Sequence, residues 1–98
     1  ALEGVLRSIQ AEIARHLAEY DAARAQVSIL DTAIVPQARQ TVASMLAGYQ
    51  VNKVDFLNVV NGQLTLYNAQ INYWEALSKA KRSLAGVAAA VGTEALYE

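Results

Sequence analysis

Apolar side chains in the second half of the chain recur at alternating steps of three and four residues, and this pattern constrains the fold most strongly. The average spacing of 3.5 residues is that of a coiled coil, in which side chains of one helix fit between those of a facing helix. We therefore predict one long helix over about 55–91, followed by a tail at 92–98. The residues expected to make the inter-helix packing are Leu57, Val60, Leu64, Tyr67, Ile71 and Trp74.

The first half of the chain carries a similar series and few helix-breaking residues. Its apolar members are Leu6, Ile9, Ile13, Leu17, Tyr20, Val27, Leu30 and Ile34. We predict a helix over about 2–50. Pro36, the only proline, removes a backbone donor and crowds the carbonyl four residues earlier, so a kink is expected near Thr32–Pro36. The alternative at this position is a complete break between two helices.

A turn at about 51–54 separates the two predicted helices. Asn52 is a residue type that tolerates the left-handed conformation with which many helices end. Asp55 is placed to cap the second helix, its carboxylate accepting a hydrogen bond from the backbone N–H of Leu57 or Asn58. The fold class that follows is all-α, a single long antiparallel two-helix coiled-coil hairpin.

Further rows of residues widen the apolar surface of the second helix. One is apolar and the next consists of small residues: Val59, Leu66, Tyr73 and Val87, then Gly62, Ala69 and Ala76. A polar stripe expected to face water completes the helix: Asn58, Asn61, Thr65, Asn68, Asn72, Glu75, Lys79 and Arg82. Apolar and small residues cover more than half of the circumference, which is more than one partner helix requires. We therefore expect neighbours on two sides.

The two predicted helices differ in length. Folding about the turn would pair residue i with roughly 107 − i, so that Val91 would lie opposite His16 and the first arm would overhang by about 15 residues, or roughly 20 Å. The apolar series continues through this overhang at Leu6, Ile9 and Ile13. The chain is therefore expected to assemble with copies of itself or to be excised from a larger chain.

The composition excludes several classes of function. Eight Lys and Arg residues are balanced by nine Asp and Glu residues, so the basic surplus of a nucleic-acid-binding protein is missing. There is no cysteine for a disulfide, a thiolate nucleophile or a cysteine zinc site. The uncharged stretch 56–74 contains six amide side chains, which are too costly to bury in lipid.

No catalytic, cofactor-binding or metal site is expected. Glu12, His16 and Glu19 share one helical face with a spacing that metal ligands can use, but two carboxylates and one imidazole make a weak set. We interpret them as a solvated helix face. His16 has no sequence-level reason to meet a particular serine, so no Ser–His–acid triad is predicted. The chain is expected not to be an enzyme.

The turn and the helix after it resemble the signature of TolC-type outer membrane factors. The run from Tyr49 to Gln63 reads Tyr-Gln-Val-Asn-Lys-Val-Asp-Phe-Leu-Asn-Val-Val-Asn-Gly-Gln. The family signature is Tyr, two residues, Gly, two residues, Asp, Ser or Thr, two apolar residues, a polar residue, two apolar residues and Asp-Ala-Gln. The segment 34–38 is similar to one in the family's descending helix, and the spacing through Val91-Gly92 is similar to that of its return helix.

The sequence departs from the family pattern at the turn and in the helix after it. Asn52 stands where glycine is usual, and Asn58 and Asn61 stand where acids are common. The first departure keeps a residue type that accepts the left-handed conformation. The other two remove the carboxylates on which cation binding or acid-dependent gating at the tip would depend.

The resemblance implies the wall and tip of an export duct. In that family three protomers form a β-barrel in the outer membrane and an α-barrel through the periplasm, whose wall consists of helical hairpins packed side by side. No strand pair is visible here, so the chain is similar to a hairpin excised from such an α-barrel. The turn would form the periplasmic entrance. Its docking and gating residues would be Tyr49, Asn52, Lys53, Asp55, Asn58 and Asn61.

The function expected from this resemblance is a passive conduit in an outer membrane efflux protein, with this segment in the periplasm. Family members form trimers, dock a periplasmic adaptor (membrane fusion protein) and an inner-membrane pump, and export drugs, metal ions or proteins. The alternative is a structural coiled-coil hairpin module, such as an adaptor or receptor stalk, that binds a partner through its tip. Such a module shares the coiled-coil series but does not need the second apolar row.

Overall fold

The computed structural model describes residues 1–97, which are helical on both sides of one turn and contain no strand. The first arm consists of α1 (Leu2–Ile29), the π-helical segment η1 (Leu30–Ile34) and α2 (Val35–Gln50). The second arm is α3 (Phe56–Tyr97). The all-α class and the two long helical arms expected from the sequence are confirmed.

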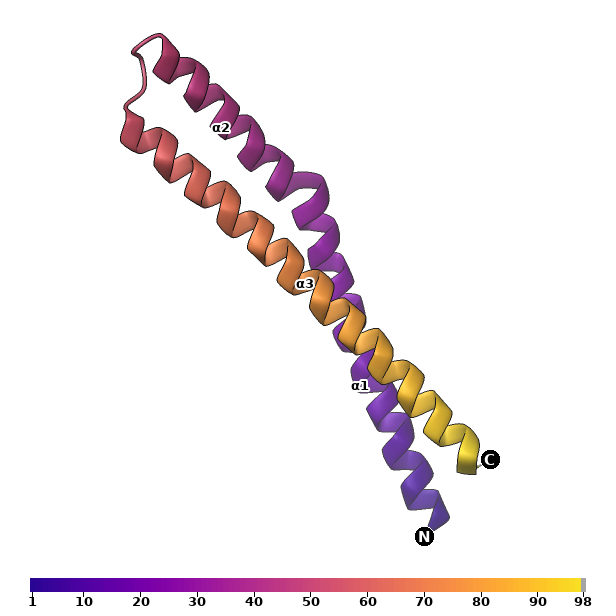
Figure 1. The fold of residues 1–98 in the computed structure, drawn as a ribbon. Helices are drawn as coiled ribbons and strands as arrows, with labels where there is room; N and C mark the ends of the chain where they lie inside the picture. Colours follow the sequence, from indigo (N-terminus) through magenta and orange to yellow (C-terminus); the bar gives the residue numbers. More distant parts are fainter. Residues whose placement is uncertain (98) are drawn as a thin grey trace. The chain divides into compact units, whose positions relative to one another are not determined.

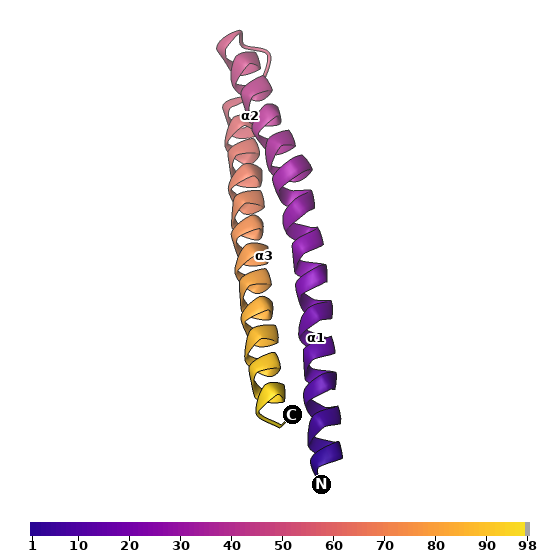
Figure 2. The same ribbon diagram turned by 90° about the vertical axis from the view of Figure 1, so that its right-hand side faces the viewer.

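The chain divides into two compact units. The hairpin unit, Gln26–Glu75, contains the end of α1, η1, α2, the turn and the first part of α3. Within it, α2 and α3 run antiparallel and side by side (Figures 1 and 2). The terminal unit contains Ala1–Ala25 and the chain from Ala76 onward. Within it, the start of α1 and the rest of α3 also lie side by side in both views.

The first arm passes Pro36 without a break, so the alternative of two separate helices is wrong. The irregularity takes the form of η1, where the backbone N–H of Val35 donates to the carbonyl of Leu30, five residues earlier. Pro36 follows directly in the first turn of α2, where its fixed backbone angle is tolerated. A π-turn holds about one residue more than an α-turn, so η1 inserts an extra residue into the arm.

The extra residue changes which side chains face the other arm. Leu30 is only 5% exposed, but the next member of the predicted series, Ile34, is 43% exposed. Val35 is half-buried in its place. The half-buried row then continues at Ala38, Val42 and Met45. Beyond Leu30 the predicted series is therefore displaced by one residue.

A different row of α3 from the predicted one faces the first arm. Its buried members are mostly small: Val59, Gly62, Ala69, Ala76, Ala80, Ser83 and Ala90. The row predicted to make this contact is largely in water, with Leu57 67% and Trp74 62% exposed. The distance between packed helices depends on the side chains at the contact, and a row of alanines and glycines lets the backbones approach more closely than a row of leucines and aromatics. We call the predicted row, from Leu57 to Trp74, the outward row.

The second arm is also longer than expected. α3 continues through Tyr97 instead of ending near Val91, so residues 92–97 are helical and not a tail. Residue 98, the last of the predicted tail, lies outside the described residues.

Much of the expected overhang of the first arm is therefore covered within the terminal unit. Ile9 is buried there. His16 faces Gly86 and not Val91, because a Cβ added to Gly86 would lie against the imidazole ring. The extra residue of η1 shifts the pairing by about one position, which is only part of this five-residue difference.

A pair of alanine substitutions tests the displaced register. Leu30→Ala is expected to lower the free energy of unfolding by about 2–4 kcal/mol, because it leaves a cavity between the arms. Ile34→Ala is expected to cost less than about 1 kcal/mol, because much of that side chain is already in water. Urea unfolding followed by far-UV circular dichroism, at one protein concentration, measures both. Equal losses at the two positions would contradict the displacement.

Candidate functional site

The turn between α2 and α3 closes as a Schellman motif. The backbone N–H of Lys53 donates to the carbonyl of Gly48 at 2.8 Å, and that of Asn52 donates to the carbonyl of Tyr49 at 3.0 Å. Asn52 has a φ of 60°, and no other non-glycine residue described has a positive φ. The prediction that Asn52 takes the left-handed position is confirmed.

A close apolar contact inside the turn was missed from the sequence. A Cβ added to Gly48 would lie 2.6 Å from the Cγ2 atom of Val54, so Val54 packs directly on the glycine backbone. Apolar contacts of this kind often accompany a Schellman motif. The signal that could have revealed it is a glycine in the last turn of a predicted helix, four residues before the left-handed position.

The predicted side-chain cap at Asp55 is not formed. The backbone N–H groups of Asn58 and Val59 donate to the backbone carbonyl of Asp55, at 3.1 and 3.3 Å. The main chain thereby starts α3 without help from the carboxylate, which forms no hydrogen bond with residues 1–97 and is exposed. The charge of Asp55 therefore remains at the surface of the tip.

The tip combines aromatic, apolar and charged surface. The six residues that the sequence assigned to it are all exposed: Tyr49, Asn52, Lys53, Asp55, Asn58 and Asn61. The rings of Tyr49 and Phe56 pack across the turn with centroids 5.8 Å apart and planes tilted by 53°. Lys53 and Asp55 form no ion pair within the described part of the chain. Such a mixed surface is typical of sites that recognise another protein.

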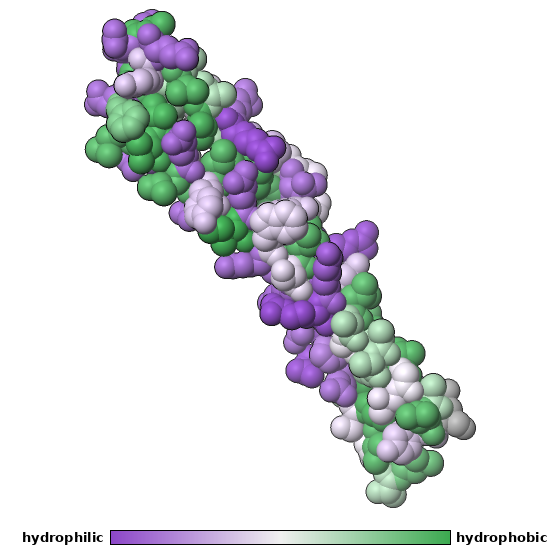
Figure 3. Space-filling model, viewed as in Figure 1, coloured by the Kyte–Doolittle hydropathy of each residue, from purple (hydrophilic) through white to green (hydrophobic). Residues whose placement is uncertain are grey.

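Beyond the tip, α3 presents two contrasting faces. The polar stripe from Asn58 to Arg82 is exposed at every position, as expected, and the Thr65 hydroxyl donates to the carbonyl of Asn61 at 3.0 Å. The outward row is exposed except at half-buried Val60. Figure 3 shows apolar side chains (green) reaching the surface beside polar ones (purple). Water-facing apolar rows of this size are unusual on a soluble monomer.

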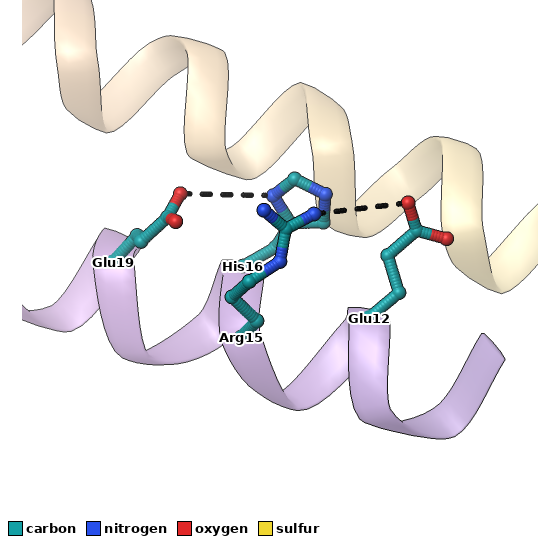
Figure 4. A network of polar contacts seen from close by, with 4 residues as sticks. All are labelled: Glu12, Arg15, His16 and Glu19. Atoms are coloured by element: carbon teal, nitrogen blue, oxygen red, sulfur yellow. Dashed lines mark ion pairs between the residues drawn. The ribbon is translucent and has the colours of Figure 1, made fainter. Parts of the chain in front are cut away.

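His16 lies in the contact between α1 and α3 of the terminal unit, and not on a solvated face. Its ring points toward α3, where a Cβ on Gly86 would lie 2.7 Å away (Figure 4). The His16 side chain is only 20% exposed, whereas Leu17, expected in the apolar series, is exposed. The steps from Ile13 to His16 and on to Tyr20 also fit the coiled-coil spacing. From the sequence, Leu17 is placed in the apolar series in preference to His16, because leucine is the more hydrophobic residue.

The charges around His16 form long ion pairs. His16 Nδ1 lies 3.8 Å from Glu19 Oε2, and Arg15 Nη2 lies 3.8 Å from Glu12 Oε1 (Figure 4). The Nδ1 atom is buried and has no hydrogen-bond partner within residues 1–97. Glu12 is directed toward Arg15 and so does not converge with the other two. No three His, Cys, Asp or Glu side chains of the described residues are placed to hold a metal ion.

Comparison with protein-family models, curated proteins and solved structures gives no match. A function is therefore inferred from the surfaces of the chain. None of the helices in residues 1–97 has the length and apolarity needed to cross a membrane. The features that the structure offers are the tip, the polar stripe and the outward row.

Substitutions of Asn52 test the left-handed turn. Asn52→Ala is expected to lower the free energy of unfolding by about 1 kcal/mol, because alanine keeps the Cβ that is strained at positive φ but loses the short polar side chain that makes this conformation tolerable for asparagine. Asn52→Gly is expected to be neutral or stabilising, because glycine carries no Cβ. Thermal unfolding measures both, and Lys53→Ala, at the next position, serves as the control with a small effect. If the alanine and glycine variants behaved alike, the left-handed assignment would be wrong.

Two glycines of α3 provide a matched test of the His16 contact. Gly92→Ala is expected to raise the free energy of unfolding by about 1 kcal/mol, because its Cβ meets nothing within 4 Å and alanine favours the helix. Gly86→Ala is expected to lose this gain, because the imidazole ring must move. In the His16→Ala background, Gly86→Ala should recover the stabilisation. If the effects of Gly86→Ala and His16→Ala on the free energy of unfolding were simply additive, the contact between these residues would be contradicted.

Proposed function

We propose that this chain is the wall and entrance-tip segment of a periplasmic α-helical export duct, of the kind that its resemblance to TolC-type outer membrane factors implies. Its role is a passive conduit, in which helical hairpins stand side by side around an aqueous path and no bond is made or broken. The partners are further copies of the same chain, a trimer in the family, together with a periplasmic adaptor and an inner-membrane pump.

The outward row is the observation that carries this proposal. Leu64 is 54% exposed and Tyr67 60%, and their neighbours in the row are similarly open to water. Covering the exposed part of each such side chain with another helix is worth about 1 kcal/mol or somewhat more, roughly half the value of complete burial, so the row favours lateral packing. The polar stripe lies on another side of α3 and would stay hydrated when the outward row is covered. A duct wall needs this combination of a dry lateral face and a wet face.

The tip supports the docking part of the proposal. Its main-chain hydrogen bonds close the turn, so the exposed rings and charges are available to a partner. Gating by a sliding of coiled coils requires two packings of similar energy. Within the described residues Lys53 and Asp55 make no ion pair that would hold the tip in one arrangement.

One observation favours the second candidate, a structural coiled-coil module with a partner-binding tip. The second apolar row, which such a module was not expected to need, is used inside the hairpin unit, where Val59 is 3% exposed. A single hairpin therefore accounts for that row. The two candidates now differ in what covers the outward row, which is another copy of the hairpin in the duct and an unrelated partner in the module.

Cysteine pairs distinguish the two candidates. Met45 contacts Gly62, so residues of the two arms whose numbers sum to 107 lie at the same level of the hairpin. Gln40 and Tyr67 satisfy this rule, and both are exposed on the outer sides of their arms. Gln40→Cys combined with Tyr67→Cys cannot bridge within one hairpin. Oxidation is expected to give covalent dimers, trimers and a closed ring, which denaturing gels without reductant separate.

The matched control places both cysteines in the contact between the arms. Ala38 and Ala69 are one heptad from Met45 and Gly62, so Ala38→Cys with Ala69→Cys should give a cross-linked monomer. If the outer pair gave no product between chains while the inner pair was fully oxidised, the duct would be contradicted and the module favoured.

A further inference from the structure

A groove opens on the hairpin unit where η1 passes into α2. Its volume is about 370 Å³, within the range of small-ligand sites. The first arm contributes Val35 and Pro36 to its lining, and α3 contributes Tyr73 and Trp74. The two rings of α3 meet edge to face with centroids 5.3 Å apart and planes at 74°. The groove therefore combines two aromatic rings with a largely polar lining, beside a π-turn, an irregularity that often occurs at functional sites.

Opposite charges stand at the two ends of this groove. Asp31 and Arg39 both line it, and neither forms an ion pair within residues 1–97. Eight residues separate them along the first arm, which corresponds to about 12 Å along a helix axis. The arms are antiparallel, so Asp31 lies at the Trp74 end and Arg39 at the end lined by Gln70.

Each end suits a different charged group. A carboxylate beside the face of an exposed indole ring is an arrangement that attracts an ammonium group. A guanidinium beside a side-chain amide offers several N–H donors to a carboxylate. The ligand that matches is an extended molecule with an ammonium at one end and a carboxylate at the other.

We propose that this groove binds short extended peptides with free termini, the amino terminus at Asp31 and Trp74 and the carboxyl terminus at Arg39 and Gln70. Three extended residues span about 10 Å, and the contact distance between opposite charges at each end makes up the rest of the roughly 12 Å between Asp31 and Arg39. A single amino acid is too short to reach both ends. The groove contains no residue of the tip and shares only Trp74 with the outward row, and its binding tests use none of the cysteine variants that test the duct.

Trp74 is the chain's only tryptophan, so its fluorescence reports directly on the groove. Titration with the tripeptide Ala-Ala-Ala, which does not absorb with indole, is expected to shift the emission to shorter wavelength in a saturable manner, because the peptide displaces water from the ring. Absence of a saturable change up to about 10 mM peptide would overturn the proposal.

Blocked peptides test the role of the two charges. N-acetylated and C-amidated Ala-Ala-Ala are each expected to bind at least about tenfold more weakly, a loss of about 1.4 kcal/mol. Alanine, the single amino acid, is expected to bind more weakly still. Equal binding of the doubly blocked peptide would show contact with the aromatic surface alone and would overturn the assignment of the charged ends.

Variants of the two end residues complete the test. Asp31→Asn and Arg39→Gln are expected to weaken binding about tenfold each, whereas Asp21→Asn and Arg24→Gln, exposed elsewhere on the same arm, should leave it unchanged. Circular dichroism checks that all four variants keep their helices. Equal losses in the control pair would mean that net charge, and not the groove, governs binding. The cysteine cross-linking of the duct does not depend on any of these outcomes.

Discussion

The close approach of the two arms through small side chains determines how the rest of the surface is used. Glycine, alanine and serine occupy most of the buried positions of α3, so the helices meet at short range and little apolar volume is enclosed. The larger leucine, tyrosine and tryptophan side chains of the outward row are left on another side. A hairpin built in this way is held together by the packing of mostly small side chains, and its larger apolar side chains remain available to other chains.

The register between the arms is a second constraint, and η1 displaces it by about one residue just before Pro36. The extra residue before Pro36 turns Ile34 out and Val35 in, and it carries Asp31 and Arg39 to the edge of a groove opposite the α3 rings. In the terminal unit, Gly86 has no side chain, and the ring of His16 fills the space that a side chain would occupy. Glycines with close neighbours thus mark where the arms fit each other.

Sequence reasoning was most successful where local chemistry decides the structure. The two helical arms, the position of the turn, the left-handed Asn52 and the exposed polar stripe all follow from residue types and their spacing. Choosing between the two apolar rows was harder, because both repeat at 3.5 residues and spacing alone does not rank them. Preference for larger side chains selected the row with Leu57 and Trp74, whereas close backbone approach selects the row with Val59 and Ala69.

The candidate sites divide in the same way. Exposure of the six tip residues could be predicted, since they surround a turn. The Asp55 cap could not, because the backbone carbonyl of Asp55 accepts from Asn58, one of the two amides that the carboxylate was expected to use, and the sequence does not show this. The groove could not be predicted from the sequence for a different reason. It joins Asp31 and Arg39 to Trp74 across the chain, and that meeting depends on the π-turn.

The turn at Asn52 has one more consequence. The backbone alone completes the hydrogen bonds of this turn, so the positions with a structural role are Asn52, Gly48 with the Val54 side chain packed on it, and the ring pair of Tyr49 and Phe56. The other residues of the turn can therefore be substituted, in evolution or by design, without changing the two helices. The turn between α2 and α3 can therefore change its binding specificity while the helices that carry it keep their structure.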